Sequence, residues 1–308
     1  MSTRYDLLVV GELNVDIIAR GAVTPRFGQV EQVVDDIALY AGSSAAIAAG
    51  AAARMGLRVV FASRVGDDEF GRYMISALQG AGVDTSGVHV DPTIKTGATI
   101  VLSRDGDRAM LTYPGSIAAV GPGDVDPAWY GAARHLHVAS PFLLTGLRHA
   151  LPGIMRRARA AGMTVSLDTN WDPEERWDVD ELLDATDVAM PNANEVRAIT
   201  RRDDLDDAVA ALTERVPLVV VKCGAEGALA ARGAERVRVP AYRVTVVDTT
   251  GAGDTFDGGF LAGWLRGEPL RRCLELGNAC AAGTLTAAGG LNGQPTWDEA
   301  MRVVVARV

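Results

Sequence analysis

The sequence has few cysteines and no apolar run long enough to cross a membrane. Its three cysteines, Cys223, Cys273 and Cys280, are odd in number and share no metal-ligand spacing, so they predict neither a disulfide framework nor a zinc site. Apolar runs such as residues 218–221 are far too short to span a bilayer, and residues 1–6 lack the basic start and apolar stretch of a signal peptide. These absences predict a cytoplasmic protein with no membrane partner.

Basic residues are scarcer than acidic ones. The 308 residues include 30 Lys and Arg against 39 Asp and Glu, which gives a formal net charge of −9. Binding to nucleic acid depends on clustered Lys and Arg, whereas the small clusters at residues 156–159 and 201–202 lie among acidic or apolar residues. We therefore expect these clusters to be solvated helix surface, and we expect no nucleic-acid partner.

Short β-branched runs alternate along the chain with Ala-rich helical patterns. The patterns predict strands at residues 7–10, 59–62, 164–167, 188–190 and 218–221, and helices at residues 43–55, 69–79, 146–161, 205–215, 252–265 and 270–287. This alternation predicts an α/β fold with a doubly wound, mainly parallel sheet flanked by helices. No linker, low-complexity tract or fixed-period repeat divides the sequence, so residues 1–308 are expected to form a single domain.

Two stretches, at about residues 14–40 and 94–115, break the alternation. They have the pattern of polar-faced antiparallel strands, with a turn at Arg104-Asp105-Gly106-Asp107 in the second stretch. Strands that project from a parallel sheet need a partner for their apolar face, either a ligand or another subunit. We therefore expect a small β-sheet lid inserted within the domain, and a homodimer formed through it.

Residues 247–260, VDTTGAGDTFDGGF, are the most informative stretch. Gly251, Ala252 and Gly253 precede Asp254 at a helix start, where small residues let backbone N–H groups converge and the helix dipole adds positive charge. This arrangement suits phosphate oxygens, and an acid beside it makes sense if Asp254 accepts a proton from a hydroxyl that attacks phosphorus. The alternative is that Asp254 only caps the helix and the glycines form a tight turn.

The same stretch resembles the C-terminal signature of the ribokinase family, the phosphofructokinase-B type of carbohydrate kinases. Further matches extend the resemblance over almost the whole chain. It implies a ribokinase-like fold and an ATP-dependent phosphotransferase that phosphorylates a primary hydroxyl of a small sugar. In that function Asp254 would be the general base, and the amides of Gly251, Ala252 and Gly253 would form the anion hole.

The resemblance also implies a sugar-binding site near the N-terminus. Asn14 and Asp16 follow the first expected strand, where the family places a sugar-binding Asn and Asp, although Asp16 could be only a turn residue. Gly42, Ser43 and Ala46 lie in a stretch that looks like the family's N-terminal signature, although Ala-rich helix packing also explains much of it.

The acceptor stays open because three polar residues usual in ribokinase are missing. Ser43 replaces a Lys, Ala46 replaces an Asn, and Ala139 replaces a Glu. Since a polyol sugar needs partners for its hydroxyls, these changes argue against ribose. A different hexose, a ketose or a nucleoside remains open, and so does a non-catalytic sugar-binding protein.

Nucleotide and magnesium sites are implied by two short elements. Asn192 and Glu195 resemble the family's Asn-x-x-Glu element, in which Asn192 would contact ATP and Glu195 would position Mg²⁺ through water; a helix capping box is the alternative. Lys222, Gly224 and Gly227 resemble the family's ATP-binding loop, and a hairpin turn is the alternative.

The remaining implied contacts surround the same loop. Gly253 and Asn278 would contact ATP, although Asn278 could instead make a polar contact within its helix. Asp248 and Thr250 would bind a monovalent cation, with K⁺ as the candidate, together with carbonyls of residues 287–290. The expected cofactors are therefore ATP and Mg²⁺, with K⁺ as an addition.

Overall fold

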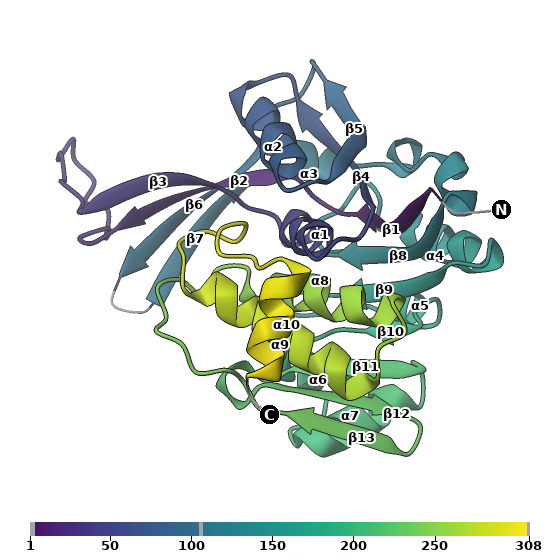
Figure 1. Cartoon of the computed structure of the whole chain (residues 1–308). Helices are drawn as coiled ribbons and strands as arrows, with labels where there is room; N and C mark the ends of the chain where they lie inside the picture. Colours follow the sequence, from purple (N-terminus) through teal and green to yellow (C-terminus); the bar gives the residue numbers. More distant parts are fainter. Residues whose placement is uncertain (1–3, 105–106, 307–308) are drawn as a thin grey trace.

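The computed structural model describes residues 4–104 and 107–306, which form a large sheet between two helix layers and a smaller sheet that projects to one side (Figure 1). The nine strands of the large sheet are, in spatial order, β13 (Glu235–Val239), β12 (Ala228–Arg232), β11 (Leu218–Lys222), β10 (Val188–Ala189), β9 (Thr164–Asp168), β8 (Ala133–Ala139), β1 (Tyr5–Val10), β4 (Val59–Gly66) and β5 (Asp84–Asp91). Neighbours from β11 to β5 are parallel, whereas β12 and β13 are antiparallel additions at one edge.

This arrangement confirms the doubly wound, mainly parallel sheet and all five expected strands. The sequence patterns missed β5, β8, β12 and β13. β5 and β8 carry polar or His residues between their apolar ones, β12 is rich in Ala, and β13 alternates Arg with Val, so none shows a continuous β-branched run.

Helices cover both faces of the large sheet. One face carries α1 (Ser44–Arg54), α2 (Glu69–Gly80), α8 (Ala252–Leu265), α9 (Leu270–Leu285) and α10 (Trp297–Val305). The other carries α4 (Leu151–Ala160), α5 (Asp180–Leu183), α6 (Ala193–Thr200) and α7 (Leu205–Thr213). Side chains of β1 alternate between the layers: Leu7 and Val9 join the first core, and Leu8 and Val10 join the second.

All six expected helices are present, with one clear boundary difference. Helix α4 begins at Leu151 rather than at residue 146, and Pro152 lies in its first turn, where a missing N–H is tolerated. The sequence patterns missed α6, α10 and the single-turn α3 (Ser116–Ala119) and α5.

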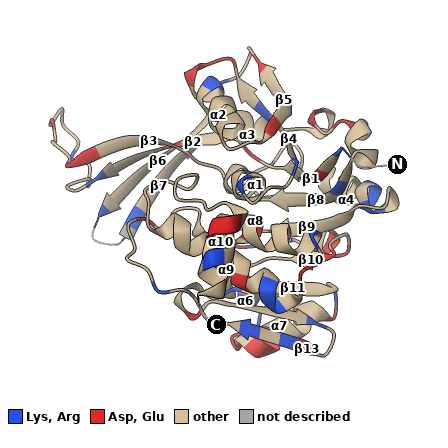
Figure 2. Cartoon of the chain, in the orientation of Figure 1, with Lys and Arg blue, Asp and Glu red and all other residues tan. Residues whose placement is uncertain are grey.

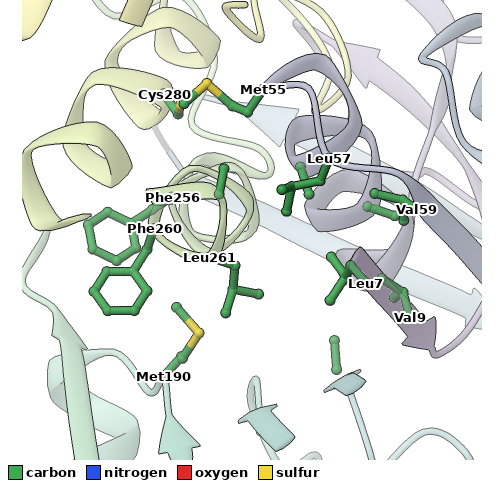
Figure 3. Close-up of a cluster of buried hydrophobic side chains, with 14 of the residues drawn as sticks. Leu7, Val9, Met55, Leu57, Val59, Met190, Phe256, Phe260, Leu261 and Cys280 are labelled. Carbon is green, nitrogen blue, oxygen red and sulfur yellow. The ribbon is translucent and has the colours of Figure 1, made fainter. Parts of the chain in front are cut away.

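Helix α8 is the most deeply packed helix near the candidate site. Figure 3 shows Phe256, Phe260 and Leu261 on the side of α8 that faces Met190 and the sheet. On its other sides, a Cβ at Gly258 would lie 2.6 Å from Ala48 O of α1, so glycine lets the two helices touch. These contacts hold the middle of α8 between the sheet and α1.

The smaller sheet has the strand order β3-β2-β6-β7. Its strands are β2 (Asn14–Arg20), β3 (Asp36–Ala41), β6 (Gly97–Arg104) and β7 (Asp107–Tyr113). β2 pairs antiparallel with β3 and β6 pairs antiparallel with β7, but β2 and β6 are parallel, which corrects the expectation of antiparallel strands throughout. The centre of the expected turn, Asp105 and Gly106, lies outside the described residues.

None of the helices in residues 4–104 and 107–306 combines the length and the apolar character needed to span a bilayer. Charged residues are spread over the outer helices and the strand ends, and Figure 2 shows basic and acidic segments interspersed.

Candidate active site

Polar side chains gather at the carboxyl-terminal edge of the large sheet. They follow β1, β8, β9, β10 and β11, and the first turn of α8 points at the same place. In open α/β sheets this edge is where ligands bind. The site therefore lies between the large sheet, α8 and the base of the smaller sheet.

Asp254 is the third residue of α8, which begins after Gly251. Gly251 has a φ of 71°, the left-handed region that favours glycine, and it offers no side chain to cap the helix. Because the N–H groups of a first helical turn have no partner within the helix, this turn can bind an anion. Asp254 does not occupy the cap position, which argues against the alternative in which it only caps the helix.

The Asp254 carboxyl is buried and shares its surroundings with other carboxyls. Burial and the charge of Asp168 raise its pKa to about 6, although Lys222 and a hydrogen bond from Asn170 oppose the rise. Asn170 Nδ2 lies 3.3 Å from Asp254 Oδ1. Asp254 can thus be ionised near neutral pH and still accept a proton, as a general base must.

A buried lysine lies behind this first turn. Lys222 Nζ donates to Asp168 Oδ2 at 2.6 Å and to Asp257 Oδ2 at 3.0 Å. Burial lowers the pKa of Lys222, but the two carboxyls more than compensate and hold it above its usual value. Burial raises the pKa of Asp257 well above its ordinary value, whereas for Asp168 burial is outweighed by the charge of Lys222 together with hydrogen bonds, and the pKa is lowered. Lys222 was predicted to contact ATP, yet its ammonium group points at carboxylates.

The predicted substrate residues lie together at the base of the smaller sheet. Asn14 Nδ2 donates to Asp16 Oδ1 at 3.1 Å, and Asp16 lies within strand β2 rather than in a turn. A Cβ at Gly42 would collide with the Asp16 carboxylate and lie 2.7 Å from Asn14 Nδ2, so only glycine fits. Ser43 caps α1, and Ala46 is fully buried in that helix.

Asp16 and Asp254 influence each other electrostatically. Burial raises the pKa of Asp16 to about 6, with Arg108 opposing the rise and Asp254 adding to it. The structure therefore brings the lid carboxyl and the α8 carboxyl to the same site, with Arg108 of β7 nearby.

A cavity of about 1060 Å³ opens beside the first turn of α8. Five of the six predicted ATP-binding residues line it: Lys222, Gly224, Gly227, Gly253 and Asn278. Its wall is completed by apolar and aromatic side chains that the sequence analysis did not single out, among them Tyr242, Val246 and Phe256. The loop from Lys222 to Gly227 also joins antiparallel strands β11 and β12. It is therefore also the hairpin turn that was the alternative prediction for this stretch.

Asn278 has a second role in this wall. Its Nδ2 donates to the carbonyls of Val239 and Pro240, both at 3.3 Å. It therefore fixes the strand exit beside the cavity while lining the cavity itself.

Asn192, the sixth predicted residue, lies outside the cavity lining and forms a capping box with Glu195. Asn192 Oδ1 accepts from the Glu195 N–H at 3.0 Å, and the Asn192 N–H donates to Glu195 Oε2 at 2.8 Å. Burial, followed by the charge of Asp168, raises the pKa of Glu195 to about 7. Asn192 also pairs with Lys222 in an isolated bridge, which keeps the element at the site.

Asp248 and Thr250 form a turn just before α8. Asp248 Oδ1 accepts from the N–H and hydroxyl of Thr250 at 2.9 and 2.8 Å, and Oδ2 accepts from the Gly289 N–H at 3.1 Å. Arg20 of the lid places Nη2 3.5 Å from Asp248 Oδ2. Hydrogen-bond donors already surround this carboxylate, and the Arg20 guanidinium supplies positive charge beside it.

Four residues at this site were given no role by the sequence analysis. Glu12, Asp168 and Asn170 have no recognisable spacing to Asp254, and Asp257 follows Asp254 by about one helical turn. The i, i+3 spacing of Asp254 and Asp257 was the one available signal.

The chain is similar to carbohydrate kinases in sequence and in fold. The model of the pfkB family carbohydrate kinase matches residues 4–297. An ATP-dependent ribose-1-phosphate kinase from Halopiger xanaduensis is 34% identical, covering 95% of each chain. An Escherichia coli protein assigned as a ribokinase II, in complex with ATP and Mg²⁺, superposes with a TM-score of 0.87 at 27% identity, over 99% of this chain and 100% of that one. Adenosine kinase from Sinorhizobium meliloti superposes with a TM-score of 0.85 at 27% identity, over 98% of this chain and 99% of that one.

The family model covers nearly the whole chain, and the structural similarity extends over both sheets. The chain therefore belongs to the pfkB family of carbohydrate kinases.

Proposed function

We propose that this protein transfers the γ-phosphoryl group of ATP to a hydroxyl, preferably a primary one, of a small sugar. The observation that carries the proposal is the position of Asp254. Its buried carboxyl lies in the first turn of α8, next to the cavity on one side and electrostatically coupled to Asp16 of the lid on the other. A base placed between a nucleotide cavity and a polyol site suits phosphoryl transfer.

The proposed step uses this chain's residues as follows. Asp254 accepts the proton of the acceptor hydroxyl while its oxygen forms a bond to the γ-phosphorus and the bond from that phosphorus to the bridging oxygen of ADP breaks. The N–H groups of Gly251, Ala252 and Gly253 stabilise charge on the transferring group. Asn14 and Asp16 orient the acceptor through its hydroxyls. Closure of the lid over the single domain would limit hydrolysis of ATP by water.

The charge of the site suits a divalent cation. Asp168, Asp254 and Glu195 surround a single lysine, Lys222, so bound nucleotide would bring further negative charge to an already acidic site. Within the described ranges no group of three or more His, Cys, Asp or Glu side chains is arranged to hold a metal. Mg²⁺ would then take most of its ligands from phosphate and water, with Glu195 acting through water.

Activation by K⁺ at Asp248 and Thr250 stays a prediction. The guanidinium of Arg20 beside Asp248 already supplies one positive charge there, which argues for a small effect. Initial rates measured in KCl and in a tetramethylammonium salt of equal ionic strength test it.

The acceptor is tested by ADP release in the presence of ATP and Mg²⁺. The panel contains pentoses, hexoses including fructose, ribose 1-phosphate, sugar acids and nucleosides. Sugar phosphates belong in it because the charge of Arg108 acts on Asp16 in the acceptor site. ADP release with a sugar or a sugar phosphate supports the proposal. ADP release with nucleosides alone would show that the protein is a nucleoside kinase instead. Ligand binding without any ADP release would show that it is a sugar-binding protein.

We also propose that the lid forms a homodimer. Leu39, Ile17, Ile100 and Leu111 are successive partners across β3, β2, β6 and β7 and therefore share one face of the lid. This face lies opposite Asp16, and Ile100 and Leu111 are 43% and 59% exposed. A row of apolar side chains on an open sheet is stabilised by a second copy of the same row.

Ile100→Asp is expected to convert the dimer to a monomer, because it places a charge at the centre of the apolar row. Sedimentation equilibrium measures the mass of the wild type and the variant. Val90→Asp on β5 is the matched control, since Val90 is 44% exposed and lies outside the lid. A monomeric wild type, or an Ile100→Asp protein that remains dimeric, would show that the lid is not the interface.

A further inference from the structure

Asn170, which follows β9, has an unusual backbone conformation for a residue with a side chain. Its φ is 49°, in the left-handed region that favours glycine, and Ser140, which follows the neighbouring strand β8, has a φ of 51°. Non-glycine residues keep this conformation only where the surrounding structure holds them, and they are concentrated at functional sites. What glycine could not supply at position 170 is the side-chain amide.

Ser140 fixes the oxygen side of this amide. Asn170 Oδ1 accepts from the Ser140 N–H at 2.9 Å and from the Ser140 hydroxyl at 3.0 Å. A backbone N–H can only donate, so the amide oxygen must face Ser140 and the NH₂ group must face away from it. The orientation of the amide therefore follows from its contacts.

The NH₂ group of Asn170 lies between two carboxyls. Its Nδ2 donates to Asp254 Oδ1 at 3.3 Å and to Asp168 Oδ2 at 3.4 Å, and the Asn170 N–H donates to Asp168 Oδ1 at 3.2 Å. Asp168 is itself held by Lys222, whose Nζ lies 2.6 Å from Asp168 Oδ2. Since an NH₂ group has one proton for each of two acceptors, Asn170 links the first turn of α8 to the buried ion pair of the sheet.

We propose that Asn170 is a positioning residue for the base: its amide, held by Ser140 and Asp168, fixes Asp254 Oδ1 and so orients the carboxyl for the acceptor hydroxyl. The proposal rests on the proposed function of Asp254. Asn170 takes no proton in the reaction and forms no bond to the transferred phosphoryl group. Because the amide follows β9 and the base belongs to α8, their contact fixes the base relative to the edge of the sheet.

The same hydrogen bond favours the ionised form of Asp254. Burial and the charge of Asp168 raise the pKa of Asp254, and the hydrogen bond from Asn170 lowers it. The other titratable groups whose charges act on Asp254 are Lys222 of β11, Asp16 of β2, Glu12 after β1 and Glu195 of α6. Removal of the amide leaves all of these groups in place, so it should raise the pKa of Asp254.

Two glycine variants test the positioning role by steady-state kinetics. Asn170→Gly removes the amide without straining the backbone, because glycine accepts the left-handed φ. It should lower kcat on the order of 100-fold, as expected when a base is misplaced by about 1 Å, with little change in KM. Ser140→Gly keeps the N–H that holds Asn170 Oδ1 and loses only the hydroxyl, so kcat should fall on the order of 5-fold. This smaller change also guards against an Asn170→Gly protein that fails to fold.

Arg201→Gly is the matched control for the backbone. Arg201 is exposed at the end of α6 and has a φ of 55°, so the substitution makes the same change of backbone freedom without removing the amide. Its kcat and KM should equal those of the wild type. Urea unfolding confirms that each variant is folded under the assay conditions.

The pH profile separates this role from a merely structural one. The acid limb of kcat, expected at about pH 6 in the wild type, should move to higher pH in Asn170→Gly and stay in place in Arg201→Gly. An Asn170→Gly protein with the kcat and the acid limb of the wild type would overturn the proposal. A raised KM at unchanged kcat would overturn it too, because that change is typical of a group that binds the substrate directly.

Infrared spectroscopy measures the pKa of Asp254 without any turnover. The spectrum of a protein minus the spectrum of the same protein with Asp254→Asn isolates the carboxyl bands of Asp254, which change as the group ionises. The midpoint of that change should lie at higher pH in Asn170→Gly than in the wild type, and equal midpoints would overturn the proposal. If no acceptor releases ADP from the wild type, the proposed function fails, and the infrared midpoints still accept or reject the action of Asn170 on Asp254.

Discussion

Asp254→Asn should lower kcat by about 100- to 10,000-fold while ATP and the acceptor still bind, because the amide keeps the shape of the carboxyl but cannot accept the proton. The fold should persist, since the change removes a charge from a buried cluster of carboxyls that already repel one another. ADP release measures kcat, and calorimetric titration with ATP and with the acceptor measures binding.

The matched control for this variant is Asp298→Asn. Asp298 also lies in the first turn of a helix, α10, but it is exposed and does not line the cavity. Wild-type kcat should rise with pH through about 6, the pKa of Asp254, because the base works only when ionised. Near-normal turnover in Asp254→Asn would remove Asp254 from the role of base.

Lys222→Met should destabilise the protein by about 3–5 kcal/mol, because it leaves Asp168 and Asp257 buried without the ammonium group between them. The charge of Lys222 also lowers the pKa of Asp254, so its removal should raise that pKa. The acid limb of kcat should then move to higher pH, and activity lost at pH 7 should partly return at pH 8. Urea unfolding measures the free energy of unfolding, and ADP release at a series of pH values measures the position of the acid limb of kcat.

The sequence offers one clear control for Lys222→Met. It contains only two lysines, and the other, Lys95, is exposed before β6. Lys95→Met should leave both the unfolding midpoint and the pH profile unchanged. If Lys222→Met is as stable as Lys95→Met, the buried ion pairs contribute no net free energy to the fold.

Local sequence patterns were sufficient for most of the fold. Alternating β-branched runs and Ala-rich stretches identified the parallel strands, because strands buried on both faces must be continuously apolar. They failed for β8, where His135 and His137 interrupt the run. In the structure both histidines bond to Ser166 of the neighbouring strand, a partner 29 or more positions away that no local pattern can reveal.

The sequence by itself determined the α/β fold class, the two separate stretches that form the smaller sheet, and the stretch around Asp254, because each depends on residues close together in the chain. Only the tertiary structure decided what surrounds Asp254. Glu12, Ser140 and Asn170 follow three different strands, and Lys222 ends a fourth; they meet only because parallel strands bring their carboxyl ends to one edge of the sheet. The pKa of a carboxyl depends on its charged and polar neighbours and on its burial, and the spacing of a sequence motif specifies neither.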